Sequence, residues 1–197
     1  MSQSRIQVNI RQRLQSPHAT WPSPGCTGPT PPTRRHVLRG ALAAAVATLG
    51  LRAIAEPALK PGDRPKPVTL RALSGPQVTL PDAFRGTVVV VHFWASWCPP
   101  CLREIDALES LFGEYRERGF APVSVNVGET PAVVTDSLGH RKVTYPILLD
   151  PESATSRLYG VVGLPTTFVL DRTGSVAVKV LGEIDRDGLR RVLSGLL

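Results

Sequence analysis

Short apolar runs alternate with amphipathic stretches along the second half of the chain. The run TVVVVHFW over residues 87–94 is continuous and rich in β-branched and aromatic residues, and FAPVSVNV over 120–127 is a second such run. Runs of this kind are typical of strands buried on both faces of a sheet. Between them, apolar residues recur every three or four positions from Cys98 to about Arg118, and Gly119 follows. This spacing predicts a long helix that ends at the glycine.

Shorter elements flank this centre. An extended linker rich in proline covers residues 56–67, and the alternation in VTLRALSGPQVTL over 68–80, around a Ser-Gly pair, predicts a β-hairpin. The later pattern predicts a helix over 130–139, a strand over 145–149, a helix over 151–159, strands over 166–170 and 175–181, and an amphipathic helix over 185–197. We therefore expect an α/β fold, with a mixed central sheet flanked by helices and an N-terminal β-hairpin extension.

Residues 1–55 differ from the rest of the chain. They contain seven arginines and no acidic residue, and 15–33 are rich in Pro, Ser and Thr, which predicts disorder. The run TRRHVLR over 33–39 resembles the twin-arginine export signature, and it is followed by twelve small or apolar residues and by Ala53-Ile54-Ala55. We expect a disordered leader and export signal over 1–55, cleaved near Ala55, and one domain over 56–197. Export places that domain in the periplasm or otherwise outside, and an uncleaved leader would leave it on an N-terminal membrane anchor.

The charge of the protein is unevenly distributed. The formal net charge is +7, but residues 56–197 carry 16 basic and 16 acidic residues, so the domain itself is neutral. It has no basic stripe with interleaved aromatic residues, and we therefore expect no nucleic-acid partner. No apolar run reaches the roughly 20 residues that span a bilayer, which excludes a multi-pass membrane protein.

Two of the three cysteines lie close together. Cys26 falls in the leader, whereas Cys98 and Cys101 share the run WCPPC over 97–101. This is too few sulfur ligands for a structural zinc site and favours redox chemistry, with no metal and no cofactor beyond a redox-active disulfide. Cys98 is placed at the start of a helix, where free N–H groups and the dipole favour a thiolate. Cys98 is thus the expected attacking group, and Cys101 the resolving thiol.

Two neighbours of the cysteines are further candidates. Glu104 lies on the same helix stripe as the sulfurs, and partial burial would raise its pKa and let it exchange a proton with Cys101. The alternative is a solvated helix carboxylate. Trp97 precedes the nucleophile as a lid and a contact for partners, or else as a packing residue.

Two segments carry a family resemblance. HFWASWCPPCLRE over 92–104 resembles the active-site segment of the TlpA/ResA-like branch of the thioredoxin superfamily, and YGVVGLPTTFVLDRTG over 159–174 resembles its second landmark. The resemblance extends from about residue 60 to the C-terminus and implies a thioredoxin-like fold. It implies Cys98, Cys101 and Glu104 as catalytic residues. It also implies a cis Pro165 that leaves the Leu164 backbone free for an extended substrate, and an insertion over about 129–149.

Two residues depart from that branch. His92 stands where thioredoxin has a buried acid and where the branch often has Asn; it is either a proton shuttle or a packed, hydrogen-bonded core residue. Its position in the strand faces the interior, which favours packing. Asp106 replaces a proline that the branch often has, so the helix is expected to lack a kink at that point.

The function that these expectations favour is a periplasmic thiol–disulfide reductase. Its implied substrates are cysteines of apocytochrome c or of copper-site proteins during their assembly, and its implied electron donor is a membrane thiol transporter. We expect a monomer. The alternatives are a disulfide oxidant and a Cu(I)-binding chaperone that uses the two thiolates, although the chain has no cluster of methionines. A peroxidase is disfavoured because Ala95 stands three residues before the nucleophile, where Thr or Ser is expected.

Overall fold

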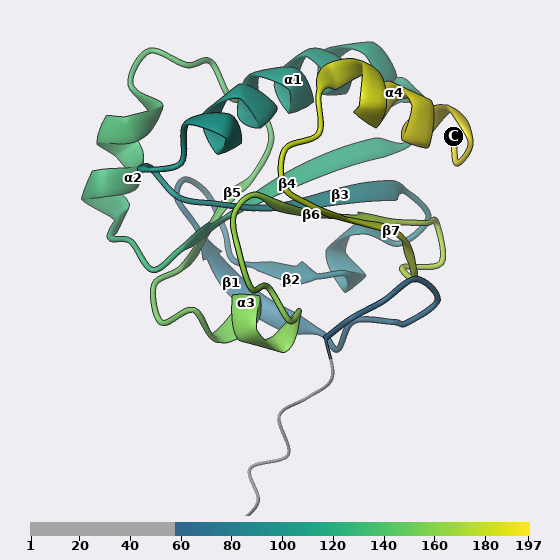
Figure 1. Cartoon of the computed structure of the whole chain (residues 1–197), viewed down its shortest axis with the longest axis horizontal. Coiled ribbons are helices and arrows are strands. Elements are labelled where there is room, and N and C mark those ends of the chain that lie inside the picture. The colour runs from purple at the N-terminus through teal and green to yellow at the C-terminus, as the bar shows by residue number, and fades with distance from the viewer. Residues whose placement is uncertain (1–57) are drawn as a thin grey trace, which may run out of the picture. The chain divides into compact units, whose positions relative to one another are not determined.

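The fold is built on a seven-stranded mixed sheet with the order β2-β1-β5-β4-β3-β6-β7 (Figure 1). The structure is a computed structural model and describes residues 58–197, so the expected leader, export signal and cleavage site lie outside the described residues. The strands are β1 Val68–Ala72, β2 Val78–Leu80, β3 Val88–Trp94, β4 Phe120–Val127, β5 Ile147–Asp150, β6 Thr166–Leu170 and β7 Val176–Leu181. The α-helices are α1 Pro99–Tyr115, α2 Pro131–Leu138, α3 Ala154–Leu158 and α4 Arg186–Ser194, with short 3-10 helices η1 Asp82–Phe84 and η2 Arg116–Arg118.

Strand β3 lies at the centre of the sheet and leads directly to the cysteines. It pairs in parallel with β4 and antiparallel with β6. All seven of its residues are buried, because both faces of the sheet are covered. Side chains alternate between the faces, so that Val90 and Trp94 belong to one apolar cluster and Val91 and Phe93 to the other.

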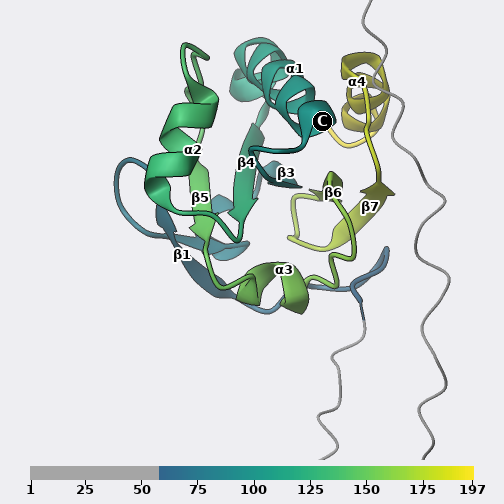
Figure 2. The ribbon, with the colours of Figure 1, turned by 60° about the vertical axis from the view of Figure 1, so that its left-hand side comes forward.

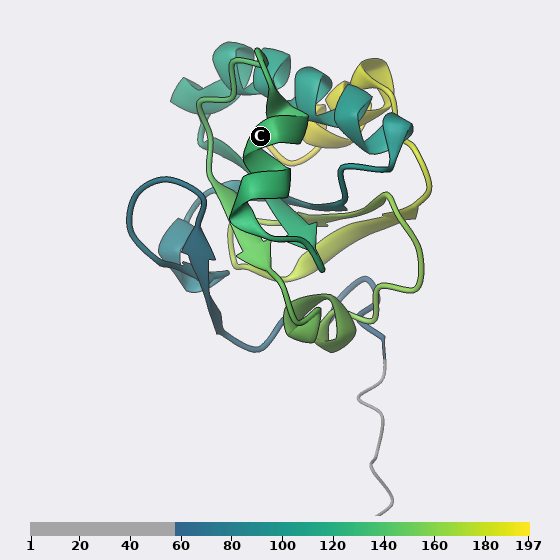
Figure 3. The same cartoon turned by 90° about the vertical axis from the view of Figure 1, so that its left-hand side faces the viewer.

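The two faces of the sheet are covered by different elements, and each face has its own apolar cluster. Helices α1 and α4 pack on one face, where Leu108 and Leu189 join the cluster of Val90 and Trp94 (Figure 1). On the other face lies the segment of α3, and the edge strands β1 and β2 of the sheet curl toward the same side, where Leu80 and Tyr159 pack (Figures 2 and 3). The mixed sheet flanked by helices, predicted from the alternation of strands and helices, is confirmed.

Local chemistry explains where the elements begin and end. Gly119 adopts a left-handed conformation with φ of 82° and ends the helical segment, as its position after the apolar stripe predicts. Helix α3 begins at Ala154 and not at residue 151, because the Asp150 carboxylate accepts hydrogen bonds from the backbone N–H groups of Thr155 and Ser156 at 3.1 and 2.8 Å. Within residues 58–197, no helix is long and apolar enough to cross a membrane.

Candidate functional site

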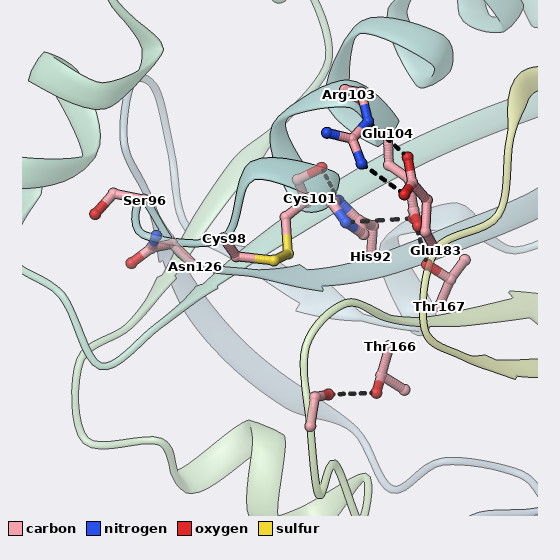
Figure 4. Close-up of a disulfide and its surroundings, with 12 residues drawn as sticks. His92, Ser96, Cys98, Cys101, Arg103, Glu104, Asn126, Thr166, Thr167 and Glu183 are labelled. Carbon is pink, nitrogen blue, oxygen red and sulfur yellow. Dashed lines mark hydrogen bonds and ion pairs between the residues drawn. A yellow bond between two sulfur atoms is a disulfide. The ribbon is translucent and has the colours of Figure 1, made fainter.

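Cys98 and Cys101 form a disulfide at the N-terminus of α1, where the sequence places them (Figure 4). Cys98 is the N-cap residue in an extended conformation, and Pro99 and Pro100 occupy the first positions of the helix. Proline is tolerated there because these N–H groups have no partner within the helix. Both residues are buried, but Cys98 is 4% exposed and Cys101 is fully covered, so Cys98 is the more accessible of the two residues. This asymmetry is the one that an attacking and a resolving thiol require.

The Leu164–Pro165 peptide bond is cis, which confirms the expectation from the resemblance. It lies directly before β6, and the pairing of Thr166 with Phe93 places it at the same sheet edge as the loop leading to Cys98. Among residues 58–197, the backbone N–H and C=O of Leu164 have no hydrogen-bond partner. They are free to pair with an extended chain.

Trp97 projects into solvent beside the cysteines. Its side chain is 71% exposed, so it does not pack into the core. Val162 and Leu181 are also large, apolar and exposed, at 83% and 62%, and Leu181 lies against Gly163 near the cis bond. The cysteine loop and the cis-proline loop thus both present apolar side chains to solvent.

Glu104 lies one helical turn after Cys101 and is 1% exposed. Its Oε1 accepts a hydrogen bond from the backbone N–H of Ile184 at 2.8 Å, and its Oε2 accepts one from Thr167 Oγ1 at 3.0 Å. Burial raises the pKa of Glu104 to about 7, although these two hydrogen bonds act in the opposite direction. Glu104 is therefore buried and not solvated, and its carboxyl can gain or lose a proton near neutral pH.

His92 lies on the α1 face of the sheet and is fully buried. Its Nδ1 is 3.3 Å from Ser124 Oγ, and its Nε2 is 3.4 Å from Oε2 of Glu104. Burial lowers the pKa of His92 to about 3, so the imidazole is neutral at physiological pH. His92 is thus a packed, hydrogen-bonded core residue, and it also contacts the candidate catalytic carboxyl (Figure 4).

Glu129 supports the cysteine loop and is a residue that sequence reasoning missed. Its carboxylate accepts hydrogen bonds from the backbone N–H of Ser96 at 2.8 Å, from Ser96 Oγ, and from Asn126 Nδ2 at 2.7 Å. Burial alone would raise the pKa of Glu129, but these hydrogen bonds outweigh it and lower the pKa. Ser96 lies two residues before Cys98, so Glu129 fixes the backbone that carries Trp97 and the nucleophile. The two residues are 33 positions apart, and no spacing in the sequence reveals the pair.

An ion pair lies at the outer rim of the site. Arg103 donates to Glu183 through Nε and Nη2 at 2.8 and 2.6 Å, and both side chains are exposed (Figure 4). The carboxylate of Glu183 adds slightly to the raised pKa of Glu104. Across residues 58–197, no group of three or more His, Cys, Asp or Glu side chains is arranged to hold a metal ion.

The geometry of the site agrees with what known proteins show. A sequence profile of the AhpC/TSA family matches residues 61–179, which is more than half of the chain. The chain belongs to the AhpC/TSA family. Together with the relatives below, this match confirms the ResA/TlpA-like resemblance within the thioredoxin superfamily.

Two relatives of this AhpC/TSA family member are named as thiol–disulfide oxidoreductases. The chain is 31% identical over 121 residues to "Thiol-disulfide oxidoreductase ResA" of Bacillus thuringiensis subsp. konkukian (strain 97-27), covering 61% of this chain and 69% of that protein. It is 27% identical over 124 residues to "Sporulation thiol-disulfide oxidoreductase A" of Bacillus subtilis (strain 168), covering 61% and 74% of the two chains.

A solved structure of a protein with the same kind of name has a similar fold. The crystal structure of a putative "Thiol:disulfide interchange protein DsbE" from Chlorobium tepidum superposes with a TM-score of 0.65 at 32% identity, covering 71% of this chain and all of that one. The protein is a thiol–disulfide oxidoreductase, and its fold is thioredoxin-like, as predicted. The chemistry it catalyses is the exchange of a dithiol and a disulfide.

Proposed function

We propose that the protein is an exported reductase of disulfides in periplasmic proteins, with Cys98 as nucleophile, Cys101 as resolving thiol and Glu104 as the proton acceptor. The observation that carries the reductive direction is the occupation of the first two helix positions by Pro99 and Pro100. A thiolate at a helix N-cap is stabilised by the N–H groups of the first turn. Pro99 and Pro100 have no N–H, so two of these groups are missing, and the Cys98 thiolate is less stabilised than at a helix start without proline. A less stable thiolate favours the disulfide form, which makes the dithiol a stronger reductant.

The reaction proceeds by two exchanges. The Cys98 thiolate attacks one sulfur of the substrate disulfide, forms a mixed disulfide and releases the first substrate sulfur as a thiolate. The Cys101 thiol then gives its proton to the Glu104 carboxylate, and the resulting thiolate attacks Sγ of Cys98. The second substrate thiolate leaves, both substrate thiolates take protons from water, and the protein is left with its disulfide.

The exposed surface around the cysteines suits a polypeptide substrate. The free N–H and C=O groups of Leu164 would pair with an extended segment beside Pro165, and Trp97 would cover an apolar side chain of that segment. A segment with two nearby cysteines in an unfolded chain meets these requirements. Cysteines of apocytochrome c or of copper-site proteins, before their cofactors are attached, are substrates of this kind.

An exported reductase needs a source of electrons in an oxidising compartment. We therefore include in the proposal a membrane thiol transporter that reduces the Cys98–Cys101 disulfide by the same exchange chemistry. Cys98 is slightly exposed and Cys101 is fully buried, so Cys98 is the cysteine that both the donor and the substrate would reach.

A stoichiometric electron-transfer assay tests the proposal. The reduced protein is mixed with an oxidised peptide that carries the haem-attachment sequence Cys-x-x-Cys-His, and free peptide thiols are counted by mass after alkylation. We expect near-complete reduction of the peptide, and none with Cys98→Ser. If instead the oxidised protein converts the reduced peptide to its disulfide and the reverse reaction fails, the protein is an oxidant and the proposal is wrong.

A further inference from the structure

A row of buried polar side chains runs from Glu104 into the core. Oε2 of Glu104 is 3.4 Å from His92 Nε2, His92 Nδ1 is 3.3 Å from Ser124 Oγ, and Ser124 Oγ is 3.2 Å from the Tyr145 hydroxyl. The Tyr145 hydroxyl in turn donates to the backbone carbonyl of Ile105 at 3.4 Å. The row crosses from α1 to β3, β4 and the segment before β5, and it returns to α1 at the Ile105 carbonyl.

The far end of this row determines where the hydrogens lie. A carbonyl oxygen can only accept, so the single hydrogen of Tyr145 is used at Ile105. Ser124 must then donate its own hydrogen to the Tyr145 oxygen, and it can only accept from His92. The neutral His92 ring therefore carries its proton on Nδ1, and Nε2 carries a lone pair.

The near end of the row agrees with this assignment. Nε2 of His92 is buried and makes no hydrogen bond among residues 58–197, although Oε2 of Glu104 lies 3.4 Å away, so a bare lone pair at this atom costs less than an N–H without an acceptor. The atom nearest to it that can carry a proton is Oε2 of Glu104, and that oxygen becomes a donor when the carboxyl is protonated.

We propose that His92 is a positioning residue that keeps the proton on Glu104: Tyr145 and Ser124 fix the His92 proton on Nδ1, and Nε2 faces the Glu104 carboxyl as an acceptor. An acceptor at this position stabilises the protonated carboxyl and opposes the carboxylate. His92 thereby works in the same direction as burial, and against the hydrogen bonds from Ile184 and Thr167.

The other groups around His92 leave this assignment in place. Strands β4 and β6 present only the neutral hydroxyls of Ser124 and Thr167 to the row. Among the described residues, the titratable and charged groups near the row are Glu104, Cys101, Asp106 and Glu109 on α1, Tyr145 before β5, and Glu183 after β7. Tyr145 is neutral because burial raises its pKa, and Glu183 is held in the ion pair with Arg103.

This inference rests on the proposed role of Glu104 as proton acceptor of Cys101. With an acceptor behind it, Glu104 holds its proton up to a higher pH. The resolving step requires the carboxylate, because the Cys101 proton moves to it. His92 therefore adds to the effect of burial and raises the pH above which the resolving thiol is deprotonated.

The tautomer of His92 is the first test. In the oxidised full-length protein, long-range ¹⁵N–¹H correlation spectra distinguish the nitrogen that carries hydrogen from the one that does not. We expect hydrogen on Nδ1 and a bare Nε2 at pH 7. Hydrogen on Nε2 would overturn the proposal, because His92 would then donate to Glu104 and favour the carboxylate.

The second test removes the group that fixes the tautomer and leaves the site untouched. In Tyr145→Phe, Ser124 loses its acceptor and can donate to His92 Nδ1, which moves the ring proton to Nε2. We expect the pKa of Glu104, measured from its ¹³C carboxyl signal, to fall from about 7 by roughly one pH unit, the effect of one hydrogen bond. An unchanged or higher pKa would overturn the proposal.

Tyr159→Phe is the matched control. Tyr159 is a buried tyrosine on the opposite face of the sheet, and its hydroxyl has no partner among the described residues. Its loss should leave the pKa of Glu104 unchanged. The role of Glu104 as proton acceptor and the role of His92 are tested separately. A normal resolving rate in Glu104→Gln would refute the first, whereas the tautomer of His92 and the pKa of Glu104 in Tyr145→Phe test only the second.

Discussion

The burial of Glu104 makes the stability of the protein depend on pH in a defined direction. The pKa of this carboxyl is about 7 in the folded protein, against an ordinary value of 4.5. Between these values the folded state retains a proton that the unfolded state has released, so stability falls as pH rises from about 4.5 to 7. Below 4.5 both states are protonated and above 7 both are ionised, so the effect is confined to this window.

The magnitude follows from the same two values. Each pKa unit corresponds to about 1.4 kcal/mol, so the difference between 4.5 and about 7 gives a destabilisation of about 3 kcal/mol at pH 8. Glu104→Gln removes the titration and keeps the shape, because the amide oxygen can still accept from Ile184 and the amide N–H can face Thr167 and His92. We therefore expect the variant to match the wild type near pH 4.5 and to be about 3 kcal/mol more stable at pH 8.

Urea unfolding of the oxidised protein at intervals from pH 4.5 to 8.5 measures this difference. The other titrating groups contribute equally to both proteins, so the difference in unfolding free energy isolates Glu104. Glu117→Gln, which changes an 87% exposed carboxylate at the end of the same helical segment, is the control and should follow the wild type. Parallel curves for wild type and Glu104→Gln would refute the assignment of a raised pKa.

Three further predictions concern the exchange reaction and the loop that carries it. Cys101→Ser should accumulate a mixed disulfide with an oxidised substrate peptide, visible as a mass increase that dithiothreitol reverses; absence of the adduct would contradict the role of Cys98 as attacking thiol. Glu129→Gln should lower stability in urea by about 1–2 kcal/mol, because a charged acceptor of three hydrogen bonds is lost; an unchanged midpoint would show that the Ser96 contacts do not hold the loop. Trp97→Ala should reduce kcat/KM for a protein disulfide roughly tenfold. Because the side chain is exposed, the free energy of unfolding should change by no more than about 0.5 kcal/mol. An equal loss of exchange rate with dithiothreitol in place of the protein substrate would show a damaged redox centre and not a lost contact.

Much of the fold follows from local patterns. The continuous apolar run at 87–94 forms the fully buried central strand, and the segment after Cys98 with apolar residues every three or four positions forms α1. Both could be predicted because the spacing of apolar residues shows which faces of an element must be buried. The beginning of α3 could not be read in the same way. It depends on the Asp150 side chain, which reaches N–H groups five and six residues ahead and delays the helix.

In the site, too, contacts between residues close in the sequence could be predicted, and contacts between distant residues could not. Cys101 and Glu104 lie in one helix and Cys98 is its N-cap, so their spacing is sufficient to bring them together. The contacts of Glu104 with Thr167 and Ile184, and of Glu129 with Ser96, join residues that are far apart in the chain and become visible only once the sheet is assembled. The hydrogen bond between His92 and Ser124 likewise depends on the register of β3 against β4, which places the two residues side by side.

The reduction potential of the Cys98–Cys101 pair tests the central claim most directly. The full-length protein is equilibrated with graded ratios of reduced and oxidised dithiothreitol at pH 7, and the fraction of disulfide is measured after acid quenching and alkylation. We predict a value near or below about −250 mV, in the range of thioredoxin, which would allow the protein to reduce its substrates. A value near about −120 mV would place it among strong oxidants and contradict the proposed direction of electron flow.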